Sequence, residues 1–204
     1  MRQFIVVGQN APTTDEFALD ALPGAGRLDL LARCVIASLL LSHGIREDVR
    51  TFLVLGDEFT VRFEGPELRG LHPDERSTAA LIKTALSERA EAVGHMEVET
   101  SPGVYLSRLD FEAVLDRASE DGMIYQLHGE GTPAVTAQPP ANPVFVLSDN
   151  ENLNPADQKT LDAVTEQRLS LGPERLHADH AITVAHNWLD TDGFSEQSTG
   201  RSRR

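Results

Sequence analysis

Short apolar runs alternate along this chain with segments of helical periodicity, and this alternation is the feature that most constrains the fold. Residues 4–7 and 51–55 are apolar runs, and between them apolar residues recur at helical spacing over 27–39. We expect Gly44 to close that helix, since glycine commonly follows a helix C-terminus. Strands that alternate with helices pack as layers around a common core. The pattern therefore predicts an α/β fold.

Three further apolar runs, in the last third of the chain, end at Leu127, Leu147 and Leu171. In open α/β sheets, ligands bind in the crevice outside the carboxyl ends of neighbouring parallel strands. If these strands are parallel neighbours, their three ends form a candidate binding site. The alternative is that the leucines are ordinary core residues, because leucine is among the residues most often buried.

The charge composition is unusual. The chain of 204 residues carries 18 basic and 32 acidic side chains, a net charge of −14, and Lys83 and Lys159 are its only lysines. A negative charge argues against nucleic-acid binding, which normally needs a basic patch. The near absence of lysine, however, is typical of proteins adapted to high salt, where long-range repulsion is screened. Short-range arginine contacts can still position phosphate in that medium.

Several classes of function are excluded or disfavoured. A single cysteine, Cys34, rules out an internal disulfide and a zinc site with several thiolates. No apolar stretch approaches the roughly 20 residues that cross a bilayer, and the chain starts with a strand-like run, so we expect a cytoplasmic protein with no membrane partner. His177 and His180 lack the H-E-x-x-H context of a zinc helix, and we expect no metal.

Four motifs carry a resemblance to a known family. They are GAGRLDLL at 24–31, LRGLHPDERS at 68–77, FVLSD at 145–149 and LSLG at 169–172. Together they resemble the archaeal tRNA (pseudouridine-54 N1)-methyltransferases of the SPOUT superfamily, and the resemblance extends over residues 1–190. It implies a SPOUT-type open, largely parallel sheet with helices on both faces, a C-terminal trefoil knot, a homodimer, and S-adenosylmethionine as cofactor.

The same resemblance implies one methyltransferase domain over residues 1–190. The remainder, 191–204, is polar, contains Gly193 and Gly200, and ends in an arginine-rich stretch. Segments of this composition cannot bury enough apolar surface to fold, so we expect a disordered tail.

The methyl-donor pocket implied by the resemblance is drawn from three segments. Family members often have glycine at the position of Ser148 and cysteine at the position of Ala181, so a catalytic cysteine is not expected here. The implied cofactor-binding residues are Leu127, Ser148, Leu171, Gly172, Pro173, Glu174, Arg175, Leu176 and Ala181.

Two arginine-containing motifs are candidates for RNA contacts. Arg33 follows Asp29 by four residues, so the two can pair on one helix face, and Arg27 stands just before them. The resemblance implies that Arg27 and Arg33 contact RNA and that Arg27 also has a catalytic role. Arg69 and Arg76 of the second motif are expected to contact phosphate. The structural alternatives are a surface ion pair and a solvated loop.

Methylation of a ring nitrogen requires that the N–H proton leave before or during transfer. A carboxylate near the ring can accept that proton. The positions of Asp29 and Asp149 in the motifs make either of them the candidate base. Transfer from S-adenosylmethionine needs no metal.

The resemblance therefore implies a tRNA pseudouridine-54 N1-methyltransferase that acts on the T-loop. Two alternatives remain open at this point. One is a related SPOUT enzyme, such as a ribosomal RNA pseudouridine N1-methyltransferase, and the other is a non-catalytic RNA-binding module.

Overall fold

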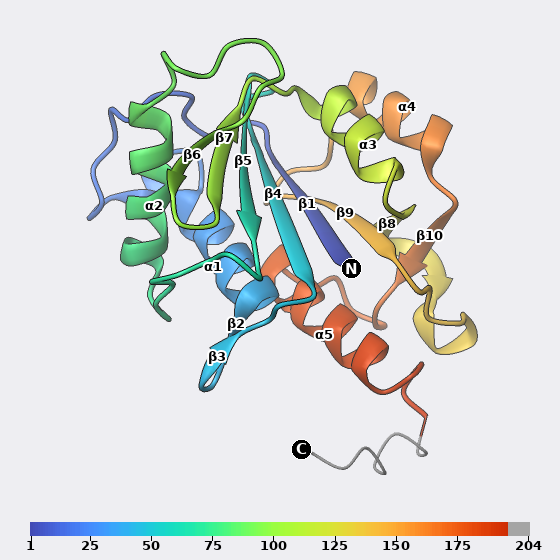
Figure 1. Cartoon of the computed structure of the whole chain (residues 1–204). Coiled ribbons are helices and arrows are strands. Elements are labelled where there is room, and N and C mark those ends of the chain that lie inside the picture. Colours follow the sequence, from blue (N-terminus) through green and yellow to red (C-terminus); the bar gives the residue numbers. More distant parts are fainter. Residues whose placement is uncertain (196–204) are drawn as a thin grey trace.

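A single eight-stranded sheet forms the centre of the protein, and the structure, a computed structural model, describes residues 1–195 (Figure 1). The strands follow one another across the sheet in an order that differs from their order in the chain. That order is β10 (Gln167–Ser170), β8 (Met123–Pro133), β9 (Pro143–Ser148), β1 (Arg2–Gly8), β4 (Val49–Leu55), β5 (Phe59–Glu64), β7 (Val104–Ser107) and β6 (Val98–Ser101).

The sheet has a parallel part and an antiparallel part. From β10 through β8, β9 and β1 to β4, all neighbouring strands are parallel. From β4 through β5 and β7 to β6, they are antiparallel. β8, β9 and β10 are therefore parallel neighbours, which is the condition on which the candidate binding site depends.

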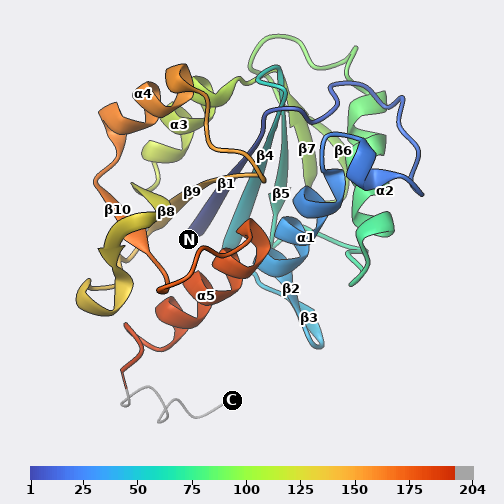
Figure 2. The same cartoon turned by 180° about the vertical axis from the view of Figure 1, so that it is seen from behind.

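Helices cover both faces of the sheet. On one face lie α1 (Leu28–Leu39), α2 (Glu75–Ser87) and α5 (Ala178–Asp190), with α1 between the other two (Figure 2). On the other face lie α3 (Phe111–Ser119) and α4 (Pro155–Val164). The predicted α/β architecture with helices on both faces is confirmed.

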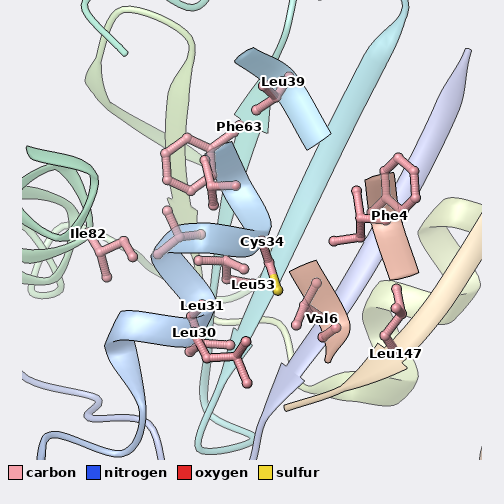
Figure 3. Packing of buried hydrophobic residues seen from close by; sticks show 14 of the residues in the cluster. Phe4, Val6, Leu30, Leu31, Cys34, Leu39, Leu53, Phe63, Ile82 and Leu147 are labelled. Atoms are coloured by element: carbon pink, nitrogen blue, oxygen red, sulfur yellow. The ribbon is translucent and has the colours of Figure 1, made fainter. Parts of the chain in front are cut away.

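The alternation of side chains along β1 explains why both faces need helices. Phe4 and Val6 point into the core under α1 and α5, while Ile5 and Val7 point into the core under α3 and α4. Figure 3 shows Phe4 and Val6 on the first face, together with Cys34 of α1. Full burial of a side chain such as phenylalanine contributes about 2 kcal/mol, so a strand that is apolar on both sides is stable only between two helical layers.

Helix starts are defined by side-chain caps. The carboxylate of Asp74 accepts a hydrogen bond from Ser77 N at 2.7 Å at the start of α2, and Asp110 accepts one from Ala113 N at the start of α3. Asn154 caps α4 in the same way, with Pro155 as the first helical residue. Such caps satisfy backbone N–H groups that have no partner inside the helix.

The expected end of the first helix was wrong. α1 ends at Leu39, because Leu40 adopts an extended conformation with φ −83° and ψ 132°. Gly44 instead belongs to a short hairpin of β2 (Leu40–Leu41) and β3 (Gly44–Ile45). The apolar residues that seemed to continue the helix are the first strand of this hairpin.

The chain beyond α5 continues as a turn over residues 191–194. Gly193 N donates to Trp188 O at 2.9 Å, and Phe194 packs against the core. The rest of the segment that we expect to be disordered, 196–204, lies outside the described residues. The trefoil knot stays a prediction. Within residues 1–195, no helix is both long enough and apolar enough to span a bilayer.

Candidate functional site

A cavity of about 310 Å³ lies at the carboxyl ends of β9 and β10 and beside residues 127–129 of β8. The expected end of the β8 strand at Leu127 was wrong, because β8 continues to Pro133. Its walls come from a bulge in β8, the loops after β9 and β10, and the start of α5. The lining residues are Leu127, His128, Gly129, Leu147, Ser148, Asp149, Asn150, Glu151, Asn152, Leu169, Ser170, Leu171, Gly172, Glu174, Arg175, Leu176, His177, Ala178 and Ala181.

The first wall is a large bulge in β8. Gln126 pairs with Arg168 of β10, but the next β10 residue, Leu169, pairs with Thr132, so residues 127–131 have no partner on β10. Gly131 is required inside this bulge, because a Cβ at this position would lie 2.6 Å from the Leu169 backbone. The bulge thereby places residues 127–129 in the cavity wall.

The second wall is the loop after β9. Asp149 N donates to Val7 O at 3.0 Å, and the Asp149 carboxylate accepts a hydrogen bond from Glu151 N at 2.9 Å. The Gln9 side chain holds the far end of the loop: it donates a hydrogen bond to Asn152 O and accepts one from Asn154 N. The loop is therefore fixed to the end of β1, and its side chains have defined positions.

Burial raises the pKa of Asp149 above its ordinary value. Hydrogen bonds from the backbone at Glu151 and Gln9 and the positive charge of Arg27 offset this effect only in part. Asp149 forms no ion pair with any described residue, and it faces the cavity. A half-buried carboxylate of this kind can hold or accept a proton more readily than an exposed one.

The third wall is the loop 171–177 with the first turns of α5. Ser170 Oγ donates to Gly172 O at 3.0 Å, and there is open space beside the Gly172 Cα. Ala178 and Ala181 present small side chains to the cavity. Pro173 belongs to this loop but does not line the cavity, unlike the other eight implied cofactor residues.

The first arginine motif lies beside the cavity rather than in its wall. Gly26 has φ +56°, and a Cβ there would lie 1.9 Å from Asn10 O, so only glycine fits. Arg27 follows with φ 59°, a left-handed conformation that is costly for a residue with a side chain. Its guanidinium donates to both oxygens of Asp29, at 2.9 and 3.0 Å.

Arg33 connects three helices through one guanidinium. Its Nη1 lies 3.1 Å from the Asp29 carboxylate of α1 and 2.9 Å from that of Glu75 in α2. Its Nε lies 3.1 Å from Asp179 of α5. The predicted pair of Asp29 and Arg33 is confirmed, while its links to α2 and α5 join residues too far apart in the sequence to be predicted.

The two candidate bases therefore have opposite environments. Burial alone would raise the pKa of Asp29, but hydrogen bonds from Arg27 and Arg33 outweigh it and hold the pKa below its ordinary value. Asp29 is 5% exposed and does not line the cavity. Its carboxylate is thus an acceptor for arginines, whereas Asp149 is the carboxylate with proton affinity at the cavity.

The two arginines of the second motif are exposed and do not line the cavity. Arg69 donates through Nη1 to the carbonyl oxygens of Pro66 and Leu68, at 3.1 and 2.7 Å. Arg76 lies in the first turn of α2, beside the capping residue Asp74. Neither arginine forms an ion pair with another residue in the range 1–195.

Sequence reasoning missed several cavity residues. His128 and Gly129 lie in the β8 bulge, which a strand pattern does not reveal. Asn150, Glu151 and Asn152 follow Asp149 directly, so the polar loop after β9 was the available signal. His177, whose neighbour Ala178 starts α5, also lines the cavity, although its sequence context indicated no ligand-binding role.

Other chemistry has little support among the described residues. Cys34 is fully buried, and burial raises the pKa of its thiol well above the ordinary value, so it is not a nucleophile. Over residues 1–195, no group of three or more histidine, cysteine, aspartate or glutamate side chains is arranged to hold a metal ion.

Comparisons with known proteins agree with this geometry. A family model described as "Putative SAM-dependent RNA methyltransferase" matches residues 1–194. The tRNA (pseudouridine(54)-N(1))-methyltransferase of Haloferax volcanii is 59% identical over 196 residues, which cover 96% of this chain and 99% of the relative. The enzyme of that name from Methanocaldococcus jannaschii is 39% identical over 207 residues, covering 96% and 100%.

A solved structure shows the same fold. Archaeoglobus fulgidus Nep1, bound to S-adenosylhomocysteine, aligns with a TM-score of 0.67 at 8% sequence identity, covering 95% of this chain and 99% of that chain. At this identity the likeness concerns the fold alone. The family match, the full-length relatives and the cavity at the strand ends lead to one assignment: the chain belongs to the SAM-dependent RNA methyltransferase family that its motifs predicted.

Proposed function

We propose that this protein methylates N1 of pseudouridine 54 in the T-loop of tRNA, with S-adenosylmethionine as methyl donor. The main evidence for this substrate is the Haloferax volcanii enzyme named for the same reaction, which is 59% identical over 96% of this chain. The cavity supports the donor, because eight of the nine residues implied by the motifs line it together.

The lining residues fit the chemistry of the donor. Leucines 127, 147, 171 and 176 offer apolar surface for an adenine ring, and exposed backbone at the strand ends offers hydrogen bonds to its edge. The carboxylates of Asp149, Glu151 and Glu174 match a ligand with ammonium and sulfonium charges. Open space beside Gly129 and Gly172 lets a ligand approach the backbone closely.

When bound, S-adenosylmethionine supplies a methyl group on a positively charged sulfur. The bond from sulfur to methyl carbon breaks as the bond from N1 to that carbon forms, and the N1 proton must leave. We assign Asp149 as the acceptor of that proton, because it faces the cavity and has a raised pKa. Asp29 is then a positioning residue, since both of its oxygens accept hydrogen bonds from arginine.

Arg27 is proposed to contact the target nucleotide from outside the cavity. Its guanidinium is fixed by Asp29 and is close enough to Asp149 for their charges to interact. A positive charge there stabilises the anionic form of a uracil ring that has lost its proton, and a fixed donor needs no reorganisation during the reaction.

The decisive experiment measures tritium transfer from labelled S-adenosylmethionine. The acceptors are tRNA with pseudouridine at position 54, the same tRNA with uridine there, and ribosomal RNA. Transfer to the first alone supports the proposal. Transfer to ribosomal RNA alone supports the related enzyme, and tRNA binding without any transfer supports a non-catalytic module.

We also propose that the protein acts in the cytoplasm as a homodimer. A second cavity of about 880 Å³ lies among α1, α5 and the β2–β3 hairpin. Its lining includes Ile36, Leu40 and Ile45, and Leu41 beside them is 44% exposed. An apolar surface of this kind fits a second copy of the chain. Light scattering after gel filtration in high salt tests the homodimer, and a monomer mass would refute it.

A further inference from the structure

We propose that Arg69, Arg76 and Arg175 form a track that binds the phosphate backbone of the tRNA substrate. The inference rests on the proposed function and specifies where the RNA lies on the protein. It assigns Arg175, which the motifs placed among the cofactor residues, to the RNA instead.

The first support is the number of arginines that form no ion pair. The described part of the chain contains 13 of them, and 10 form ion pairs with carboxylates, so that 13 − 10 leaves three. These three are Arg69, Arg76 and Arg175. With 32 acidic residues against 18 basic ones, carboxylate partners are abundant in this chain. An arginine that faces solvent without one is available for an external anion.

The second support is that all three side chains are exposed and are set on defined backbone. Arg69 is anchored through Nη1 to two carbonyl oxygens, which leaves its other guanidinium nitrogens free of any bond to described residues. Arg76 lies in the first turn of α2, where the helix dipole also favours an anion. Arg175 lies in the cavity wall and is exposed at its surface.

The third support is the position of the three arginines relative to one another. Arg33 binds Glu75, the neighbour of Arg76, and Asp179, four residues after Arg175. The start of α2 and the start of α5 therefore flank the same point on α1 (Figure 2). The track runs from the cavity past Arg33 to the start of α2 and the loop before it.

Three of the carboxylates along this track are already neutralised. Asp29, Glu75 and Asp179 all accept ion pairs from Arg33, and Asp29 accepts a second from Arg27. These three carboxylates therefore do not compete with RNA phosphate for the unpaired arginines. Guanidinium groups bind phosphate oxygens through paired hydrogen bonds, which persist where long-range attraction is screened by salt.

The test measures tRNA affinity by fluorescence anisotropy without S-adenosylmethionine, so that a role in cofactor binding cannot lower the signal. The variants are Arg69→Gln, Arg76→Gln, Arg175→Gln and the triple variant. Lys159→Gln is the matched control, because Lys159 is an exposed cation on α4, on the opposite face of the sheet.

Each single variant is expected to weaken tRNA binding about fivefold, and the triple variant about a hundredfold. The slope of log affinity against log salt concentration falls by about 0.7 to 0.9 for each arginine–phosphate pair that a substitution removes. Lys159→Gln leaves both quantities unchanged. Circular dichroism melting curves confirm that each variant is folded.

Two outcomes overturn the proposal. One is a folded triple variant that binds tRNA as tightly as the wild type, and the other is an equal loss of affinity in Lys159→Gln. In either case, methylation of pseudouridine-containing tRNA by the wild-type protein is a separate measurement. Its success would leave the proposed function intact while the arginine track fails.

Discussion

The parallel and antiparallel parts of the sheet use carboxylates in opposite ways. At the antiparallel edge, Glu64 pairs with Arg50 and Arg62, and Glu97 pairs with Arg62 and Arg117. At the carboxyl ends of the parallel strands, the cavity carboxylates pair with no cation among the described residues, and they are Asp149, Glu151 and Glu174.

This difference separates stability from function. A carboxylate inside an arginine network is held ionised and in place, and it contributes to the fold. A carboxylate left unpaired at a cavity adds little stability but remains able to bind a cation or accept a proton. In a chain with so many acidic residues, the absence of a partner is therefore more informative than the presence of a charge.

The largest effect is expected from Asp149→Asn. General-base catalysis contributes about 10²- to 10⁴-fold, so methyl transfer in a single turnover should fall by at least about a hundredfold. Thermal stability should not fall, because the substitution removes a half-buried charge that has no ion pair. A rate within threefold of the wild type would remove Asp149 from the mechanism.

Arg62→Met, in the antiparallel part of the sheet, is expected to lower stability and to leave methyl transfer unchanged. Arg62 is largely buried, contacts Glu64 and Glu97, and lies over the Tyr105 ring at 4.1 Å. Removing one partner of a buried ion pair costs about 3–5 kcal/mol, and the loss here should be near 3 kcal/mol because Glu97 keeps Arg117. Urea denaturation measures the loss, and methyl transfer by the folded protein should be unchanged.

A third prediction uses the pH dependence of stability to distinguish the environments of Asp29 and Asp149. The pKa of Asp29 is lowered in the folded state, so its stabilisation is present above the unfolded pKa of about 3.9 and is lost as pH falls through the lower folded value. The pKa of Asp149 is raised, so stability increases as pH falls through that folded value towards 3.9.

Asp29→Asn should therefore lower stability at neutral pH by about 1–3 kcal/mol and make its decline in acid shallower. Asp149→Asn should instead remove a gain in stability that the wild type shows in mild acid. Unfolding by urea at a series of pH values gives both profiles. Identical profiles for the two variants would contradict the contrast between the two sites.

The smallest effect is expected from Glu174→Gln in the cavity wall. An exposed carboxylate that faces a cationic ligand contributes about 0.2–1 kcal/mol, which corresponds to a loss of S-adenosylmethionine affinity of about 1.4-fold to fivefold by calorimetry. Glu67→Gln, at an exposed glutamate that accepts a hydrogen bond from Tyr105, is the control. An equal loss in both variants would mean that Glu174 does not face the ligand.

The sequence predicted the architecture well because the signals for it are local. The strands that lead to Leu147 and Leu171 depend on neighbouring residues, whereas the expected strand end at Leu127 was wrong because β8 continues through its bulge to Pro133. The end of α1 was wrong because Leu40 and Leu41 continue the apolar pattern, while their conformation is set by pairing with residues 44–45.

Parts of the site depended on contacts between distant residues. The link between Arg33 and Asp179 spans 146 residues, and the β8 bulge arises from its register with β10. Neither leaves a periodic signal in the sequence. The environments that distinguish Asp29 from Asp149 likewise follow from burial and arginine neighbours, which become visible only in the folded chain.

The three walls of the cavity come from residues 127–129, 147–152 and 169–181. During synthesis, the chain up to residue 181 must therefore leave the ribosome before the last wall can close. A ligand that binds only the closed cavity cannot assist the early stages of folding, and it adds its binding energy only at the end. Nascent chains that stop short of α5 would thus be unable to sequester the methyl donor.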